Sequence, residues 1–153
     1  MASLLAPQTP AAEMPVYFNV DATVGAAPAE NRREDVLLVQ FYCSLISKGT
    51  STLTAEERAS FDAVKVTGVV DAETIAAIRA AQMKMKKQQP GTVVDGRVSP
   101  AKGGYNYGGG FWTIASLNSV VHKDNMNTWP RIDKIAGCPA EIQQMVKRTL
   151  VGN

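Results

Sequence analysis

The segment GVVDAETIAAIRAAQ, residues 68 to 82, carries the signals that decide the fold. Gly68 accepts the left-handed backbone of a tight turn, and Val69 and Val70 after it favour extended backbone. Asp71 is a good N-cap, because its carboxylate accepts an orphan backbone amide and faces the positive end of the helix dipole. The segment therefore predicts a turn, a capped helix start and a helix.

The predicted helix has one apolar face, made at helical spacing by Ile75, Ile78, Ala81 and Met85. Gln82 stands where an apolar residue would complete this face. Because a buried polar group must find a partner, bonding of its amide to the backbone of the next turn is favoured over contact with a ligand. Thr74 has a simpler role, since it lies in the capped first turn.

Length and composition indicate one soluble globular domain. The chain has 153 residues, of which 45% are hydrophobic and 20% charged. A net charge of +2 is too small to imply a nucleic-acid partner. No stretch approaches the ~20 apolar residues of a membrane-spanning helix, so we expect no membrane span.

The start of the chain, MASLLAPQTPAAEMP, does not resemble a secretory signal, because it lacks a basic region and Pro7 interrupts its apolar stretch. We expect synthesis in the cytoplasm without a cleaved signal peptide, followed by delivery to the periplasm or incorporation into a phage or secretion particle. Of the two cysteines, Cys43 lies in the apolar run VLLVQFYCSLI and is expected in the core.

Two further helices are predicted ahead of the opening segment. Asn31 and Glu34 have the spacing of a capping box, which starts a helix that runs to about Ser47 and is apolar around most of its surface. Thr54 and Glu57 repeat that spacing before a second helix, whose Phe61 and Val64 face inward. Residues 1–30 are expected to form an arm with at most one short strand, in VYFNV.

The later part of the chain is less regular. Ser99 and Pro100 suit the cap and first position of a helix, which the loop KGGYNYGGG then interrupts before the helix resumes at Phe111 or Trp112. A last helix is predicted from Pro139, with Ile142, Met145, Val146 and Leu150 facing inward. The extended backbone and turn of VTGVVD recur in TVVDG, which is the internal repetition of the sequence.

The pattern G-x-x-D-x-x-T-x-x-A-I-x-x-x-Q is matched by Gly68, Asp71, Thr74, Ala77, Ile78 and Gln82. A D-G turn follows at Asp95 and Gly96, and a W-x-x-L-like helix at 112–117. With these motifs, residues 31–121 resemble the peptidoglycan-binding type 1 domain family, a small three-helix module. The resemblance implies a mainly α fold: a small orthogonal helical bundle at 31–121, with the N-terminal arm 1–30 and a C-terminal extension 122–153 that holds one helix.

The inventory of reactive residues argues against an enzyme. His122 is the only histidine, so a zinc site with several histidines cannot be assembled. Ser119, His122 and Asp124 lie too close together on a helix end for a nucleophilic triad, and His122 is expected at the surface near the helix C-terminus. We therefore expect no catalytic residues, no metal and no cofactor.

Paired carboxylates that cleave sugars are not expected either. Such a pair needs an acid of raised pKa across a groove from a second carboxylate. Glu56, Glu57, Glu73 and Asp95 all have simpler roles in caps or on exposed helix faces.

Binding is the function that the resemblance implies. A peptidoglycan stem peptide carries carboxylates and amides, which Arg79, Gln82, Arg97 and a tyrosine such as Tyr105 or Tyr107 could bind. The resulting expectation is a non-catalytic peptidoglycan-binding module for stem peptide or glycan, acting as the targeting subunit of a hydrolase or of an envelope-penetrating machine.

An alternative function remains open at this stage. The same fold could serve as a structural or adaptor component of a phage particle, a tail-like injection device or a secretion apparatus. In that case residues 1–30, 103–110 and 122–153 would contact other protein subunits. The glycine-rich loop is the place where such a contact would most readily be added, because loops carry function.

Overall fold

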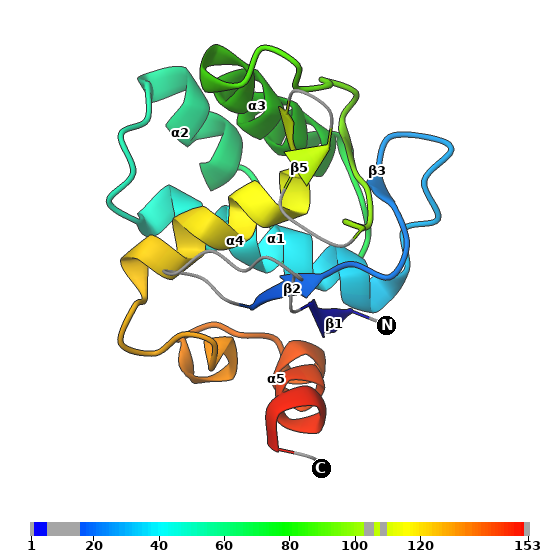
Figure 1. Cartoon of the computed structure of the whole chain (residues 1–153), viewed down its shortest axis with the longest axis vertical. Helices are drawn as coiled ribbons and strands as arrows, with labels where there is room; N and C mark the ends of the chain where they lie inside the picture. Colours follow the sequence, from blue (N-terminus) through cyan, green and yellow to red (C-terminus); the bar gives the residue numbers. More distant parts are fainter. Residues whose placement is uncertain (1, 6–15, 103–105, 108–109, 152–153) are drawn as a thin grey trace.

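The computed structural model describes residues 2–5, 16–102, 106–107 and 110–151. The fold is mainly helical, as predicted, with small strand pairs (Figure 1). The helices are α1 (Arg33–Lys48), α2 (Ala55–Asp62), α3 (Ala72–Gln88), α4 (Thr113–Asp124) and α5 (Ala140–Val146), with a 3-10 turn at Ile132–Lys134 and a π turn at Lys147–Val151. The antiparallel strand pairs are β1 (Ser3–Leu5) with β2 (Tyr17–Asn19), β3 (Val24–Gly25) with β4 (Arg97–Val98), and β5 (Asn106–Tyr107) with β6 (Gly110–Phe111).

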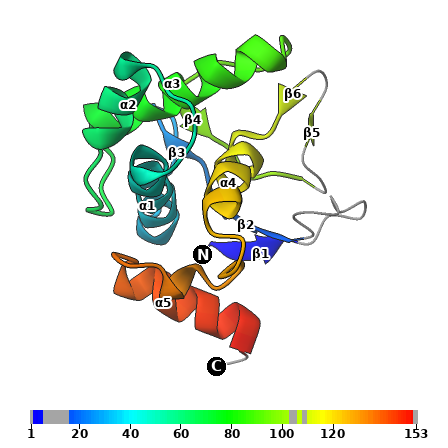
Figure 2. The same cartoon turned by 90° about the vertical axis from the view of Figure 1, so that its left-hand side faces the viewer.

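Helix α1 lies at the centre of the molecule. It contacts α2, α4, α5 and β3, and Figure 2 shows α3 and α5 on opposite sides of it. Its sequence explains this place, because apolar side chains surround it and its middle part is buried on all sides. Cys43 is fully buried there, as predicted.

A single core joins the N-terminal, middle and C-terminal parts of the chain. Tyr17 and Phe18 of β2, Phe41 of α1, and Ile142 and Met145 of α5 are all buried in the same cluster. Residues 30 and 121 therefore mark no break in the core. Among the described residues, no helix has both the length and the apolar character needed to cross a lipid bilayer.

The local helix-start signals give two confirmed predictions. Thr54 and Glu57 form the capping box of α2, with the Thr54 hydroxyl accepting from the Glu57 N–H and the Glu57 carboxylate accepting from the Thr54 N–H. Asp71 caps α3 by accepting from the Thr74 N–H at 2.8 Å. The Thr74 hydroxyl also donates to Asp71, at 2.6 Å.

The predicted capping box at Asn31 is wrong. Helix α1 begins at Arg33, and no side chain caps it. Asn31 instead adopts a left-handed backbone with φ of 54°, and its amide accepts from the Gly25 N–H and donates to the Gly25 carbonyl. These two bonds to Gly25 engage the side chain that the helix would have used.

The helix predicted from Ser99 and Pro100 is also absent. The preceding residues form β4, which pairs with β3, and the Ala101 N–H and carbonyl bond to the side chain of Asn19. These long-range partners hold the backbone extended, so α4 begins only at Thr113. In and just after the predicted loop, Asn106–Tyr107 and Gly110–Phe111 pair as two short antiparallel strands.

The N-terminal segment holds β1, β2 and β3, more than the one short strand predicted there. The predicted strand in VYFNV is β2. The other strands were missed because they are two or three residues long and β3 pairs with β4, far away in sequence.

His122 is buried, in contrast to the predicted surface position. Its side chain is only 8% exposed, in the last turn of α4. The chain after α4 folds back over it, and the Trp129 ring packs edge-on against the imidazole, with the two ring centroids 5.5 Å apart. The final helix agrees with its prediction: Pro139 is the N-cap of α5, and Ile142, Met145 and Val146 face the core.

A buried glutamine fixes the turn before α3. The Gln40 side-chain oxygen accepts from the N–H groups of Thr67 and Gly68, both at 2.9 Å. Its amide nitrogen donates to the Val69 carbonyl at 2.9 Å and to the Thr74 hydroxyl at 3.1 Å. We call this set of bonds the first glutamine clamp. It ties α1 to the turn at 67–69 and to the first turn of α3.

Replacing Gln40 should destabilise the protein strongly. In Gln40→Leu, buried backbone groups of the turn lose their partners, which we expect to cost about 3 kcal/mol and to lower Tm by roughly 6–12 °C. Thermal unfolding followed by circular dichroism measures the effect. The same change at exposed Gln144 is the control and should alter stability by no more than about 0.5 kcal/mol. Equal effects of the two substitutions would contradict the clamp.

The Asp71 cap should make stability depend on pH. Hydrogen bonds from the Thr74 side chain and backbone lower the pKa of Asp71 below 3.8, so its contribution is present above about pH 4 and is lost as the pH falls through the lowered value. Asp71→Ala should therefore cost about 1 kcal/mol at pH 7 and less at pH 2.5. Urea unfolding at both values tests this; an equal cost at both would show that the charge does not contribute.

Candidate ligand-binding site

A second buried glutamine repeats the arrangement at the turn after α3. The Gln82 side-chain oxygen accepts from the N–H groups of Asp95 and Gly96, at 3.1 and 2.9 Å. Its amide nitrogen donates to the Arg97 carbonyl at 2.8 Å and to the Thr113 hydroxyl at 3.2 Å. This second glutamine clamp ties α3 to the turn at 95–97 and to the start of α4. The predicted structural role of Gln82 is thereby confirmed.

The two clamped turns match residue by residue, in VTGVV (66–70) and VDGRV (94–98). The first turn residue accepts from the N–H of the third: the Thr67 hydroxyl from Val69 at 3.2 Å, and the Asp95 carboxylate from Arg97 at 3.0 Å. The glycine between them is buried and has a positive φ, +82° at Gly68 and +71° at Gly96. The repetition seen in the sequence is therefore a repetition of structure.

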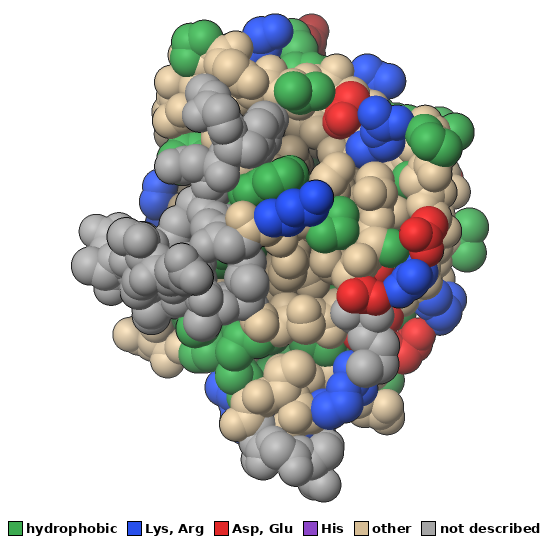
Figure 3. Space-filling view, turned by 45° about the vertical axis from the view of Figure 1, so that its right-hand side comes forward, with side chains coloured by type: hydrophobic (Ala, Val, Ile, Leu, Met, Phe, Trp, Pro, Cys, Tyr) green, Lys and Arg blue, Asp and Glu red, His purple; other side chains and the backbone are tan. Residues whose placement is uncertain are grey.

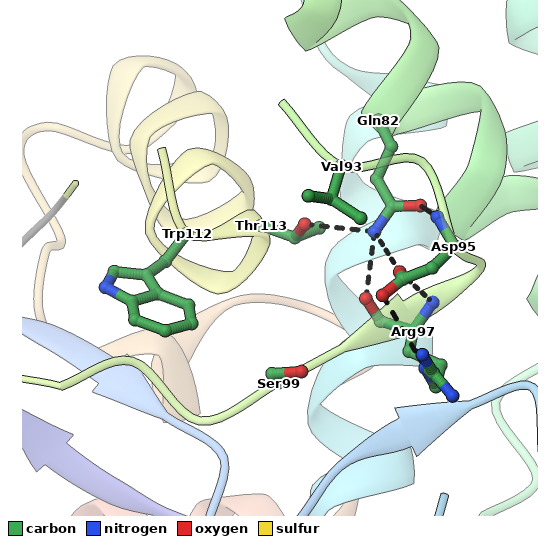
Figure 4. Close-up of a pocket in the computed structure, with 7 residues that line it drawn as sticks. All are labelled: Gln82, Val93, Asp95, Arg97, Ser99, Trp112 and Thr113. Carbon is green, nitrogen blue, oxygen red and sulfur yellow. Dashed lines mark hydrogen bonds and ion pairs between the residues drawn. The ribbon is translucent and has the colours of Figure 1, made fainter. Parts of the chain in front are cut away.

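A shallow pocket lies beside the second clamp (Figure 4). It is lined by Gln82, Val93, Asp95, Arg97, Ser99, Trp112 and Thr113. Figure 4 shows Trp112 and Ser99 on one side of the pocket and the Gln82, Asp95 and Arg97 group on the other. Helix α3, β4 and the start of α4 thus each contribute a wall.

The size of the pocket limits what it can hold. Its volume is about 150 Å³. Pockets for whole small molecules commonly span about 300–1,000 Å³. This pocket therefore has room for one chemical group at the end of a larger ligand, such as a carboxylate or a short side chain.

The polar groups of the pocket differ in their availability. Gln82 is 1% exposed and both ends of its amide are bonded, so it shapes the pocket floor. The Arg97 side chain is 33% exposed, with its Nε 3.5 Å from the Asp95 carboxylate and its Nη1 3.3 Å from the Ala27 carbonyl. A guanidinium has five N–H donors, so Arg97 retains donors for a ligand.

The other predicted binding residues lie in different places. Arg79 is exposed on α3 outside the pocket lining, and its guanidinium lies near Gly96. Tyr105 falls outside the described residues, and for Tyr107 only the backbone, in β5, is described. Ile78 of the predicted motif is buried in the core.

Sequence reasoning missed several members of this region. Ser99, Thr113 and Val93 were not predicted as site residues, and for Trp112 a role as an anchor in the core was favoured over contact with a ligand. Their role depends on how the chain between β4 and α4 folds back. Gln40 was missed as well, although its counterpart Gln82 was found, because it lies within an apolar run.

The metal-ligating residues and the two cysteines bear on metal and covalent chemistry. Within the described ranges, no group of three or more His, Cys, Asp and Glu side chains could hold a metal ion. Burial raises the pKa of Cys43 and of Cys138 to about 12, which keeps both thiols protonated at neutral pH. The arrangement beside Arg97 is suited to hydrogen bonding and charge pairing.

A larger depression, about 370 Å³, lies between the C-terminal ends of α1 and α4. Lys48 and Lys123 are among its lining residues, and the Asp124 carboxylate within it accepts from the Thr50 N–H at 3.2 Å. That contact bridges the two helix ends. None of the residues that the resemblance implies lines this depression, so the pocket beside Gln82 is the stronger candidate.

A side chain at Gly96 should crowd Arg79 and Ile75 of α3, which lie over this turn. In Gly96→Ala the alanine would have to adopt the left-handed backbone of Gly96. Its Cβ would also lie 3.1 Å from Arg79 Nε and 3.2 Å from Ile75 Cγ2. Gly137→Ala is the matched control, since Gly137 has φ of +86° and nothing within 4 Å of a built Cβ. We expect Gly96→Ala to cost about 1 kcal/mol more than the ~1 kcal/mol of the control in urea unfolding. Equal costs would argue against the close contact.

Comparison of this chain with known protein families, with curated proteins and with solved structures gave no match.

Proposed function

We propose that this chain is a non-catalytic peptidoglycan-binding module, whose residues 31–121 form an orthogonal helical bundle of the peptidoglycan-binding type. The observation that carries the proposal is the pocket beside the second glutamine clamp. There, Gln82, Asp95 and Arg97, which the family resemblance and the binding chemistry singled out separately in the sequence, lie together. The mainly helical fold agrees with the resemblance.

The pocket suits one end of a stem peptide. Stem peptides present carboxylates and amides, and Arg97 offers charged N–H donors to a carboxylate. The Ser99 hydroxyl can donate or accept, and Trp112 provides an apolar wall opposite Arg97 (Figure 4). The volume of about 150 Å³ fits a terminal group of the peptide, while the rest of the wall polymer would lie across the surface.

The binding would be one part of a larger activity. A non-catalytic module holds its target and leaves cleavage to another protein or domain. A targeting subunit of a hydrolase or of an envelope-penetrating machine needs this property. The chain would then place its partner at the cell wall through the Arg97 pocket.

Sedimentation with purified peptidoglycan sacculi tests the proposal. The folded protein should pellet with sacculi, and Arg97→Gln should weaken binding about tenfold, because one charge-assisted interaction is worth roughly 1.5–3 kcal/mol. Binding should also weaken as salt rises, since Arg97 is partly exposed.

The control is Lys134→Gln, which removes the same charge from an exposed site outside the pocket and should leave pelleting unchanged. If the folded wild-type protein stays in the supernatant at low salt, the wall-binding function is wrong. The structural or adaptor role in a phage particle or secretion apparatus would then be the better explanation.

A further inference from the structure

An arginine of α1 lies over the first clamped turn and binds a carboxylate. Arg33 of α1 lies over Gly68, since a Cβ built on that glycine would be 2.5 Å from Arg33 Nη1, and this nitrogen donates to the Thr67 carbonyl at 3.0 Å. The other side of the guanidinium donates to Glu141 from Nε at 2.7 Å and from Nη2 at 3.3 Å. Glu141 lies in the first turn of α5, so this pair helps to dock α5 on α1.

The second clamped turn also has an arginine over its glycine, although Arg79 stands three residues before Gln82 whereas Arg33 stands seven before Gln40. Arg79 lies over Gly96, with Nε and Cζ at 3.1 and 3.3 Å from a built Cβ. In both turns the arginine comes from the same helix as the clamping glutamine: Arg33 with Gln40 on α1, and Arg79 with Gln82 on α3. Arg79 makes no hydrogen bond or ion pair with any residue that the structure describes, whereas Arg33 holds Glu141.

The surface around Arg79 is basic and partly apolar. Met83, one helical turn further along α3, is 56% exposed. Lys86 and Lys87 follow at the exposed end of the helix, and the one acidic residue of α3 is Glu73, at its other end. Towards the upper end of Figure 3, where α3 lies, Lys and Arg side chains stand beside hydrophobic ones, with some acidic side chains among them. The excess of basic residues along α3 is complementary to an acidic partner.

We propose that Arg79 and Met83 form a docking site for an acidic helix of a partner protein, whose first-turn glutamate binds Arg79 as Glu141 binds Arg33. The internal pair supplies the chemistry: a carboxylate at a helix start, held by a guanidinium over a clamped glycine. Acidic residues are favourable in the first turn of a helix, so a partner helix can present one there without cost. Met83 offers the apolar contact that a helix face needs, and Lys86 attracts further acidic residues, whereas Lys84 and Lys87 already lie near the Glu57 carboxylate of α2.

This site is separate from the pocket that carries the proposed function. Arg79 is not among the residues that line that pocket, and Met83 lies on the exposed surface of α3. A partner could therefore occupy α3 in a protein that binds the wall through Arg97, and the docking site does not depend on wall binding.

A designed peptide provides the probe. It copies residues 138–151 of this chain, which include Glu141 and the apolar residues of α5, with Lys147 and Arg148 replaced by glutamate. Titration of the ¹⁵N-labelled full chain should shift the Arg79 Nε–H and Gly96 N–H signals in saturable fashion. Arg79→Gln should weaken binding at least about tenfold, and so should Glu141→Gln in the peptide.

Two variants separate this site from its internal counterpart. Arg33→Gln in the full chain should leave peptide binding at Arg79 unchanged. Arg79→Glu should abolish binding of the peptide and restore it for a peptide with Glu141→Lys. Restored binding would require that residue 79 of the chain pairs directly with residue 141 of the peptide. A variant that had only lost its fold would not regain binding in this way.

Two kinds of result would contradict the proposed docking site on α3. No saturable shift at Arg79, or shifts centred on Gly68 that vanish with Arg33→Gln, would show that the peptide merely competes with α5 and that α3 is no docking site. If a soluble peptidoglycan stem peptide shifts Arg79 and the acidic helix does not, the carboxylate belongs to the cell wall and the protein partner is wrong. Failure of sacculus pelleting would leave all of these readouts unaffected.

Discussion

The arrangement of the helices depends on two buried glutamine side chains. Gln40 and Gln82 are 0% and 1% exposed, and each uses its oxygen for two backbone N–H groups and its nitrogen for a carbonyl and a threonine hydroxyl. A buried amide without partners is costly, so each glutamine can be buried only if its turn has this shape. The first links α1 to α3 and the second links α3 to α4. The hydrophobic core holds these helices together, while the two amides fix how they connect.

A buried side-chain amide also stabilises the short strand β2. Strand β2 is only Tyr17–Asn19, and a pair of such short strands is marginal alone. The Asn118 side chain therefore acts as a neighbouring strand would, accepting from the Phe18 N–H at 2.9 Å and donating to the Phe18 carbonyl at 2.8 Å. The Tyr42 hydroxyl donates to the same Asn118 oxygen at 2.7 Å. Side-chain amides thus replace much of the hydrogen bonding that a larger sheet would provide.

How much of the fold could be predicted depended on whether a signal was local. The caps at Thr54 and Asp71 were predicted correctly, because a cap bonds to backbone only a few residues away. The same spacing misled at Asn31, where Gly25 offers a backbone N–H and carbonyl that compete for the side chain. Gln40 gave no local signal at all, since its partners lie in a turn beyond α2 and its neighbours in sequence are apolar. Interactions between segments far apart in the sequence therefore decided where the predictions failed.

The two clamped turns differ in what surrounds them, and only part of this difference could be predicted from the sequence. After Gly68 the chain enters α3 almost at once, and the surface beside the turn is occupied by Arg33 and Glu141. After Gly96 the chain passes through β4 and a long connection before α4 begins, and this detour places Trp112 across from the turn and leaves a pocket. The turn itself and its polar residues could be predicted from the sequence motif, whereas the opposite wall could not, because Trp112 is separated from the turn by a long connection in the sequence. The pocket therefore lies at the turn that is followed by a long connection, while the turn at 67–69 is covered by Arg33 and by Glu141 of the C-terminal helix.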